Sequence, residues 1–175
     1  MVSDPENSEG IEEMIEKLFT KTENGYVPRD LGRQEYRKCG NKSPVLTLQI
    51  EEVLFNIRAP DRSLDEYARA HGYIYFQAYR SIRERGWILI PCLFGEYLYE
   101  IHPPNKEFNR KDAVAKEFLK IVPPLSHLDP AVFSLTDNRP VVFAISDADS
   151  FVLVRGEALD SAKSLVAKYA PPPRK

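Results

Sequence analysis

The sequence predicts an α+β protein built from two small modules, the C-terminal one carrying a mixed sheet flanked by helices. Helical spacing of apolar residues dominates the first half of the chain, whereas short apolar runs typical of strands come mostly after Trp87. A length of 175 residues is enough for one large domain or two small ones. We therefore predict an N-terminal α+β domain over residues 1–65 and a C-terminal domain over residues 66–175.

The first half of the chain reads as helices separated by turns. A helical stripe predicts a helix over Ile11 to Thr20, and a second stripe beginning at Ile50 predicts one that ends near Ile57. Val45 to Leu48 is a candidate short strand. Ser63 precedes Glu66 by three residues, as in a capping box, and predicts a helix that starts there.

The stretch from Tyr73 to Gly95 organises the chain as helix, turn and buried strand. Gly86 is the expected end of the helix because glycine adopts the left-handed conformation without steric penalty. The apolar run Trp87 to Leu93 predicts the strand that follows. Arg80 and the arginines after it fall on the polar side of the helix, where we expect a solvated face.

The second half alternates strands and loops. Glu96 to Ile101 has the alternation of a strand, while Val114 to Val122 fits a helix or a strand equally well. Asp129-Pro130 is a helix start, and it predicts a short helix over Ala131 to Thr136. The apolar runs Pro140 to Ile145 and Phe151 to Arg155 predict two strands of a hairpin joined by an acidic turn. A helical pattern over Glu157 to Tyr169 and a proline-rich tail, Ala170 to Lys175, follow.

Composition excludes several classes of protein. The net charge of −2 gives no overall basic signal for nucleic acid, although a local basic patch stays possible. Cys39 and Cys92 are far apart, which argues against a zinc site or a disulfide framework. The sequence shows no apolar segment long enough to span a membrane and no signal peptide, so we expect a cytoplasmic protein.

Residues with catalytic chemistry are few. His71, His102 and His127 each lie in a predicted connection, where a solvated histidine is the expected reading. Asp147 and Asp149 resemble a metal site, but no third ligand lies nearby in the sequence and an acidic turn is the simpler interpretation. No metal and no cofactor are expected.

Four segments in the right order resemble the archaeal tRNA-intron splicing endonucleases. The helix Val45 to Ile57 and the hairpin Pro140 to Val154 are similar to elements of that family. Between them lies the most specific motif, Tyr79-Arg80-x-x-Arg83-x-x-Gly86-Trp87 followed by Phe94-Gly95. The resemblance covers roughly Val45 to Gly156 and implies the two-module α+β fold.

The resemblance also implies an activity. The family cleaves precursor tRNA at both ends of an intron without a metal, leaving a 2′,3′-cyclic phosphate and a 5′-hydroxyl. A tyrosine, a histidine and a lysine carry the reaction, in which the 2′-oxygen attacks the adjacent phosphorus. That reaction needs a base, an acid and a cation on the developing charge.

This chain departs from the family at the catalytic positions. Ala115 stands where the family has histidine, and Arg139 stands where it has lysine. Arginine keeps the charge but does not readily give up a proton. Tyr97 and Tyr99 are near the tyrosine position, but the register points to Glu100 or Ile101. We therefore expect no catalytic residues in this chain.

The resemblance then implies a structural subunit that pairs with a catalytic relative in an (αβ)2 heterotetramer and meets precursor tRNA through that complex. Asp147 and Asp149 match the family's acidic loop, which inserts into a basic cleft of the opposite partner. The strand residues Phe151, Val152, Leu153 and Val154 would pair edge to edge with the catalytic subunit.

Two alternatives stay open. The chain is itself catalytic if His102 or His127 replaces the missing histidine. It is an unrelated α+β interaction module if the four segments match by coincidence, and it then has no RNA-processing partner.

Overall fold

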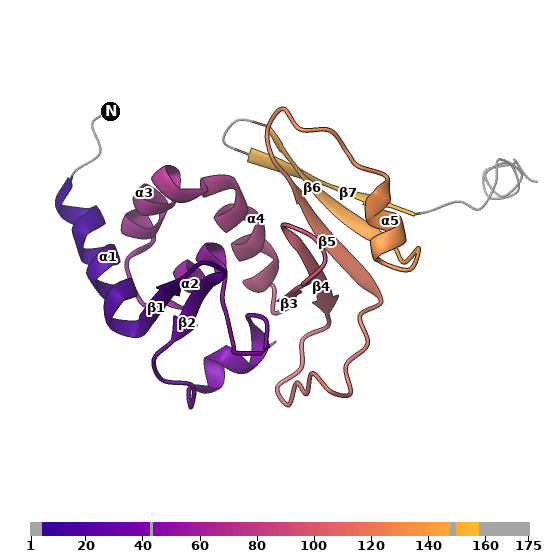
Figure 1. The fold of residues 1–175 in the computed structure, drawn as a ribbon. Helices are drawn as coiled ribbons and strands as arrows, with labels where there is room; N and C mark the ends of the chain where they lie inside the picture. The colour runs from indigo at the N-terminus through magenta and orange to yellow at the C-terminus, as the bar shows by residue number, and fades with distance from the viewer. Residues whose placement is uncertain (1–4, 43, 148–149, 158–175) are drawn as a thin grey trace, which may run out of the picture.

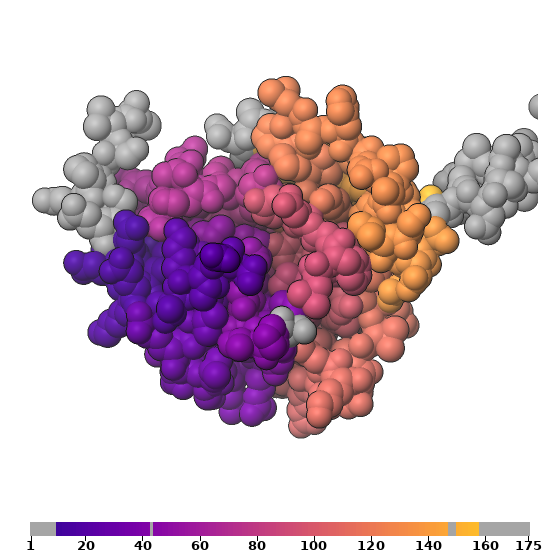
Figure 2. Space-filling view, viewed as in Figure 1, coloured from indigo at the N-terminus to yellow at the C-terminus, as the bar shows by residue number. Residues whose placement is uncertain are grey.

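The computed structural model describes residues 5–42, 44–147 and 150–157 and confirms the α+β class. Figure 1 shows a mainly helical N-terminal module beside a sheet module, with α4 (Tyr73–Arg83) between them. In Figure 2 the surfaces of the two modules meet through the middle of the face shown. In the described part of the chain, no helix is both long and apolar enough to cross a membrane.

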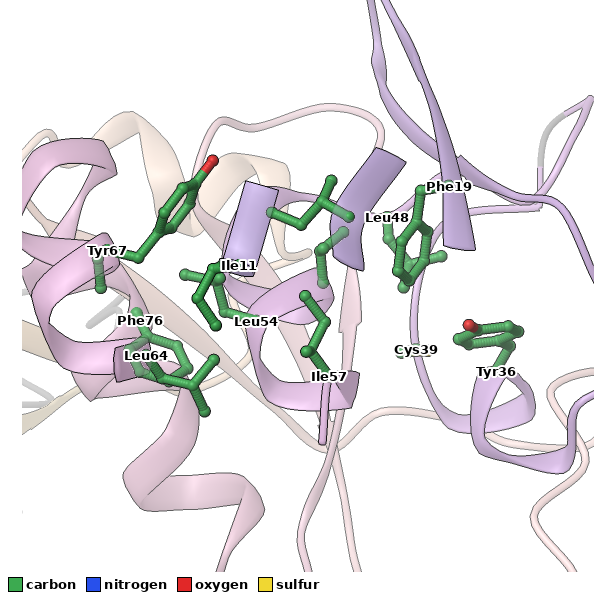
Figure 3. Close-up of a cluster of buried hydrophobic side chains, with 13 residues drawn as sticks. Ile11, Phe19, Tyr36, Cys39, Leu48, Leu54, Ile57, Leu64, Tyr67 and Phe76 are labelled. Carbon is green, nitrogen blue, oxygen red and sulfur yellow. The ribbon is translucent and has the colours of Figure 1, made fainter. Parts of the chain in front are cut away.

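The N-terminal module packs helices around a small β-hairpin. Its elements are α1 (Pro5–Leu18), β1 (Phe19–Thr22), β2 (Gly25–Pro28), the 3-10 helix η1 (Gln34–Lys38), α2 (Ile50–Asn56) and α3 (Asp61–His71). Figure 3 shows side chains from these separate elements meeting in one core, among them Ile11, Leu54, Leu64 and Tyr67. The predicted first helix ends two residues early because Phe19 begins β1.

Helices α2 and α3 have different N-terminal caps. Gln49 and Glu52 form a reciprocal capping box at the start of α2. The capping box predicted at Ser63 is wrong, because α3 begins at Asp61 and Ser63 is buried inside the helix. Pro60 precedes α3 with φ of −57°, which already suits a helix entry, and Asp61 places negative charge in the first turn.

α4 belongs to both cores. Its Phe76 packs in the N-terminal core, while Tyr79 and Ile82 pack against the sheet. Gly86 follows with φ of +88°, which confirms the predicted helix ending. The prediction of a solvated arginine face is wrong at Arg80, whose side chain is four-fifths buried among the carboxylates of Asp61, Asp65 and Glu84.

The sheet module is a five-stranded mixed sheet in the order β3-β4-β5-β6-β7. Its strands are β3 (Ile88–Pro91), β4 (Leu98–His102), β5 (Glu117–Val122), β6 (Val141–Asp147) and β7 (Ser150–Gly156). Neighbouring strands are antiparallel except β5 and β6, which are parallel and joined through α5 (Ala131–Leu135). The segment Val114 to Val122, which fitted a helix or a strand equally well, is thus a strand from Glu117. The predicted hairpin of β6 and β7 is confirmed.

Helices lie on both faces of this sheet, as predicted. On the α4 face, Tyr99, Leu119 and Ala144 pack with Tyr79. On the α5 face, Phe118 and Phe143 belong to a second cluster that includes residues of α5.

Two sequence-based boundaries need comment. The domain boundary predicted after residue 65 lies inside α3, whose buried residues Leu64, Tyr67 and Ala68 all belong to the N-terminal core. The helix predicted over Glu157 to Tyr169 and the tail after it lie, from residue 158 onward, outside the described residues.

Candidate functional site

The structure places Ala115 and Arg139 side by side. Ala115 lies just before β5 and Arg139 just before β6, and these two strands are parallel neighbours, so their starts meet at one edge of the sheet. Arg139 Nη1 donates a hydrogen bond of 2.8 Å to the carbonyl oxygen of Ala115. The two positions that the resemblance assigns to histidine and lysine are therefore in direct contact.

The guanidinium of Arg139 is held by the local structure. Its Nε donates to the carbonyl oxygen of Thr136 at 3.0 Å, and Nη2 lies 3.4 Å from Asp137 Oδ2. Its Cζ lies 4.6 Å from the centre of the Phe118 ring, within cation–π range. Each guanidinium nitrogen has an oxygen partner, so Arg139 braces the loop that enters β6.

The loop itself is strained and internally bonded. Asp137 and Asn138 both have positive φ, a conformation that costs energy for residues other than glycine. Thr136 is fully buried, and its hydroxyl donates to the carbonyl oxygens of Phe133 and Arg139. The side chain of Arg139 and the hydroxyl of Thr136 together fix this turn.

No tyrosine shares this site among the described residues. Tyr99 lies on the α4 face, where its hydroxyl donates to Glu51. Tyr97 has φ of +49° and stacks on Tyr75 with 3.8 Å between ring centres. Glu100, one of the two positions that the register indicated, pairs directly opposite Phe118 and so lies on the α5 face with Arg139.

His102 was predicted to be a solvated loop histidine, and this is wrong. It is the last residue of β4, its side chain is only 4% exposed, and Nε2 lies 3.0 Å from Glu100 Oε2. Because Pro103 and Pro104 follow it, His102 was assigned to the loop, which in fact begins one residue later. The alternation of Leu98, Glu100 and His102 on one face was the signal that could have found it.

The other histidines differ from each other. His127 is exposed in a loop, as predicted. His71 is exposed but ends α3 instead of lying in a connection, and its ring stacks on Tyr67 at 4.1 Å. Within the described residues, no three His, Cys, Asp or Glu side chains gather as metal ligands.

The strand predicted to bind a partner forms an edge of the sheet. Within the described residues β7 pairs only with β6. Its three central residues are exposed to 59% at Val152, 39% at Leu153 and 46% at Val154, whereas Phe151 is half-buried and packs on the α4 face. Register places Val152 and Val154 on the α5 face and Leu153 on the α4 face. Asp147 ends β6, and Asp149 lies outside the described residues.

A cleft of about 1060 Å³ lies between the modules. It is bounded by residues of segments 41–49 and 91–99 and by the β1–β2 hairpin. Glu96 is the single charged residue among its described lining residues. The part of the cleft that these residues form therefore offers no basic group to an RNA phosphate.

Comparison with models of known protein families finds no match to this chain. Comparison with curated proteins finds no significant match either.

Proposed function

We propose that this chain is the non-catalytic, structural subunit of a heterotetrameric tRNA-splicing endonuclease of archaeal type. In that role it positions catalytic partner subunits that remove introns from precursor tRNA in the cytoplasm. The observation that supports this most strongly is the apolar edge strand β7, in a chain whose counterparts of the family's histidine and lysine are an alanine and a backbone-bound arginine.

The edge strand has the properties of a pairing surface. An open edge presents unpaired N–H and C=O groups, and monomeric proteins usually protect such an edge with charge, proline or a bulge. β7 instead exposes three consecutive apolar residues, Val152 to Val154. Pairing with a strand of another chain would satisfy the backbone and bury these side chains.

The chemistry at Ala115 and Arg139 supports the non-catalytic reading. RNA cleavage by 2′-oxygen attack needs groups that accept and donate protons. Alanine has none, and the guanidinium of Arg139 is bound to backbone carbonyls and does not readily give up a proton. A sister chain would then supply the tyrosine, histidine and lysine.

An (αβ)2 assembly explains why an inert subunit is useful. Two cleavage sites on one folded RNA require two active sites at a fixed separation, and inert subunits can set that separation. The acidic turn at Asp147 and Asp149 would serve as an anionic contact for a basic cleft of the opposite catalytic subunit.

The test is coexpression with a candidate catalytic subunit, followed by native mass measurement. We expect a complex with two copies of each chain. A catalytic candidate that elutes separately from a monomer of this chain would instead support the unrelated interaction module.

A second candidate function has one observation in its favour. Buried His102 and partly exposed Glu100 form a pair on the same face of the sheet as Arg139, so the chain itself holds a histidine, a carboxylate and a cation there. This would make the chain catalytic with a rearranged set of groups. The test is precursor tRNA with the purified chain alone: activity that His102→Ala abolishes would establish this function.

A further inference from the structure

A polar cluster is buried where the N-terminal module meets the sheet. Glu51 on α2 is 1% exposed, and one of its carboxyl oxygens, Oε1, accepts a hydrogen bond from the hydroxyl of Tyr99 on β4. The two residues are 48 positions apart in the sequence and belong to different modules. This bond therefore ties one module to the other.

The rest of this cluster is incompletely bonded. The second carboxyl oxygen of Glu51, Oε2, is buried and has no hydrogen-bond partner among the described residues. The hydroxyl of Tyr79 on α4 is likewise buried and unpartnered within the same part of the chain. An ionised carboxylate in such a place carries a large desolvation cost, whereas a neutral carboxyl group does not.

We propose that a proton bound to Glu51 stabilises the interface between the two modules, and that loss of this proton at alkaline pH favours an open form in which the modules separate. The proton makes the carboxyl neutral and gives it a donor of its own in a region that contains unpaired oxygens. This inference concerns the fold and is independent of the function proposed above.

The charged groups around Glu51 do not offset its negative charge. Burial raises the pKa of the neighbouring Glu52. Hydrogen bonds from the backbone N–H groups of Gly40 and Gln49 partly oppose this rise, as do Arg110 from the β4–β5 connection and Arg83 on α4. Glu52 itself raises the pKa of Glu51. The described titratable groups that also lie near Glu51 are Tyr75, Tyr79 and Tyr99, and none of them is a cation.

The direction of the pKa shift agrees with the geometry. The pKa of Glu51 is raised to about 8, chiefly by burial. The residue's own backbone N–H partly opposes this rise, and the charge of Glu52 contributes to it. Opening the interface hydrates the carboxyl group and returns it toward its ordinary pKa of 4.5. Opening therefore releases a proton, so rising pH favours the open form.

Other polar contacts between described residues also join the two modules. Asn41 Nδ2 donates to the carbonyl oxygen of Pro91 at 3.3 Å, and Arg110 donates to the carbonyl oxygens of Arg37 and Cys39. Helix α2 packs on α4 and would become exposed if the modules moved apart. The backbone amides of α2 are thus suitable reporters of opening, and those of β5, central in the sheet, are suitable references.

The test combines a carboxyl titration with hydrogen exchange on the whole chain. Carbon-13 NMR of Glu51 gives its titration midpoint directly. Exchange of the α2 and β5 amides, corrected for intrinsic rates, is compared at about pH 6 and about pH 9. If opening returns the pKa from about 8 to 4.5, linkage predicts that α2 protection falls roughly 100-fold between these two pH values. The β5 amides exchange only by global unfolding and should stay better protected than those of α2 at both.

Glu51→Gln removes the titrating group while keeping the shape, and exposed Glu13→Gln on α1 is the matched control. We expect Glu51→Gln to abolish the pH-dependent loss of α2 protection and Glu13→Gln to preserve it. A Glu51 midpoint near 4.5 in the wild-type chain, or equal exchange of α2 and β5 across this pH range, would overturn the proposal whether or not the variant folds.

Discussion

Arg139 donates a 2.8 Å hydrogen bond to the carbonyl oxygen of Ala115, across a gap of 24 residues in the sequence. The bond joins the starts of two parallel strands, so it closes the crossover between β5 and β6. If the chain is a structural subunit, as proposed above, a catalytic relative would carry reactive side chains at the same two places. Here they carry a structural brace.

Replacing Arg139 with lysine should destabilise the fold. An ammonium cannot reproduce the three separate oxygen contacts or the stacking on Phe118, so we expect the free energy of unfolding to fall by about 1–2 kcal/mol. Chemical denaturation measures this change, with Arg62→Lys on the exposed side of α3 as the control. Equal stability of the two variants would show that Arg139 has no bracing role.

Two glycines should respond to alanine in opposite directions. At Gly40, with φ of +68°, a Cβ would lie 2.8 Å from the carbonyl oxygen of Thr47, so Gly40→Ala should cost about 1–3 kcal/mol. At Gly10, within α1, a Cβ meets nothing within 4 Å, so Gly10→Ala should stabilise the chain by about 0.5–1 kcal/mol. Thermal melts of both variants check the pair, and a destabilised Gly10→Ala would contradict the position of α1.

Global stability should decrease from acid to mildly alkaline pH. Burial raises the pKa of Glu51 to about 8 and that of Glu52 to about 7, both from 4.5. Because the folded state holds these protons more tightly, their contribution is fully present below about pH 4.5 and is lost as pH rises through about 7 to 8. Urea denaturation across this range should show unfolding free energy falling by several kcal/mol.

The control for this pH series is the double variant Glu51→Gln, Glu52→Gln, which should flatten the curve. A wild-type curve that rises with pH over the same interval would mean that both carboxyl groups ionise normally in the folded chain.

Charge on the edge strand should block association without unfolding the monomer. Val152 and Val154 are exposed, so Val152→Lys with Val154→Lys should change monomer stability by less than about 0.5 kcal/mol each. A lysine pair at the centre of a shared strand edge should nevertheless weaken pairing with a partner strongly. Mass measurement of the coexpressed complex checks this, with Leu125→Lys, at a fully exposed position outside the sheet, as the matched control.

Local signals predicted much of the fold. Apolar spacing located α2 and α4, Gly86 marked the end of a helix, and the β6–β7 hairpin followed from two apolar runs and an acidic turn. These features depend on neighbours within a few residues, which the sequence displays directly.

The missing features depend on distant partners. Glu51 is buried against Tyr99, and Arg80 is buried against Asp61 and Asp65. No local sequence pattern shows that a charged residue will meet such a distant partner. The contact between Ala115 and Arg139 follows from the parallel pairing of β5 and β6, which periodicity cannot supply. Arg80 and His102, which were expected to be solvated, are largely buried instead.

Reconstituted cleavage of an intron-containing precursor tRNA tests the inert-scaffold role most directly. We expect no product from this chain alone, and accurate excision when it is combined with a catalytic subunit. Cleavage by the purified chain in the absence of any other protein, ending in a 2′,3′-cyclic phosphate, would contradict it.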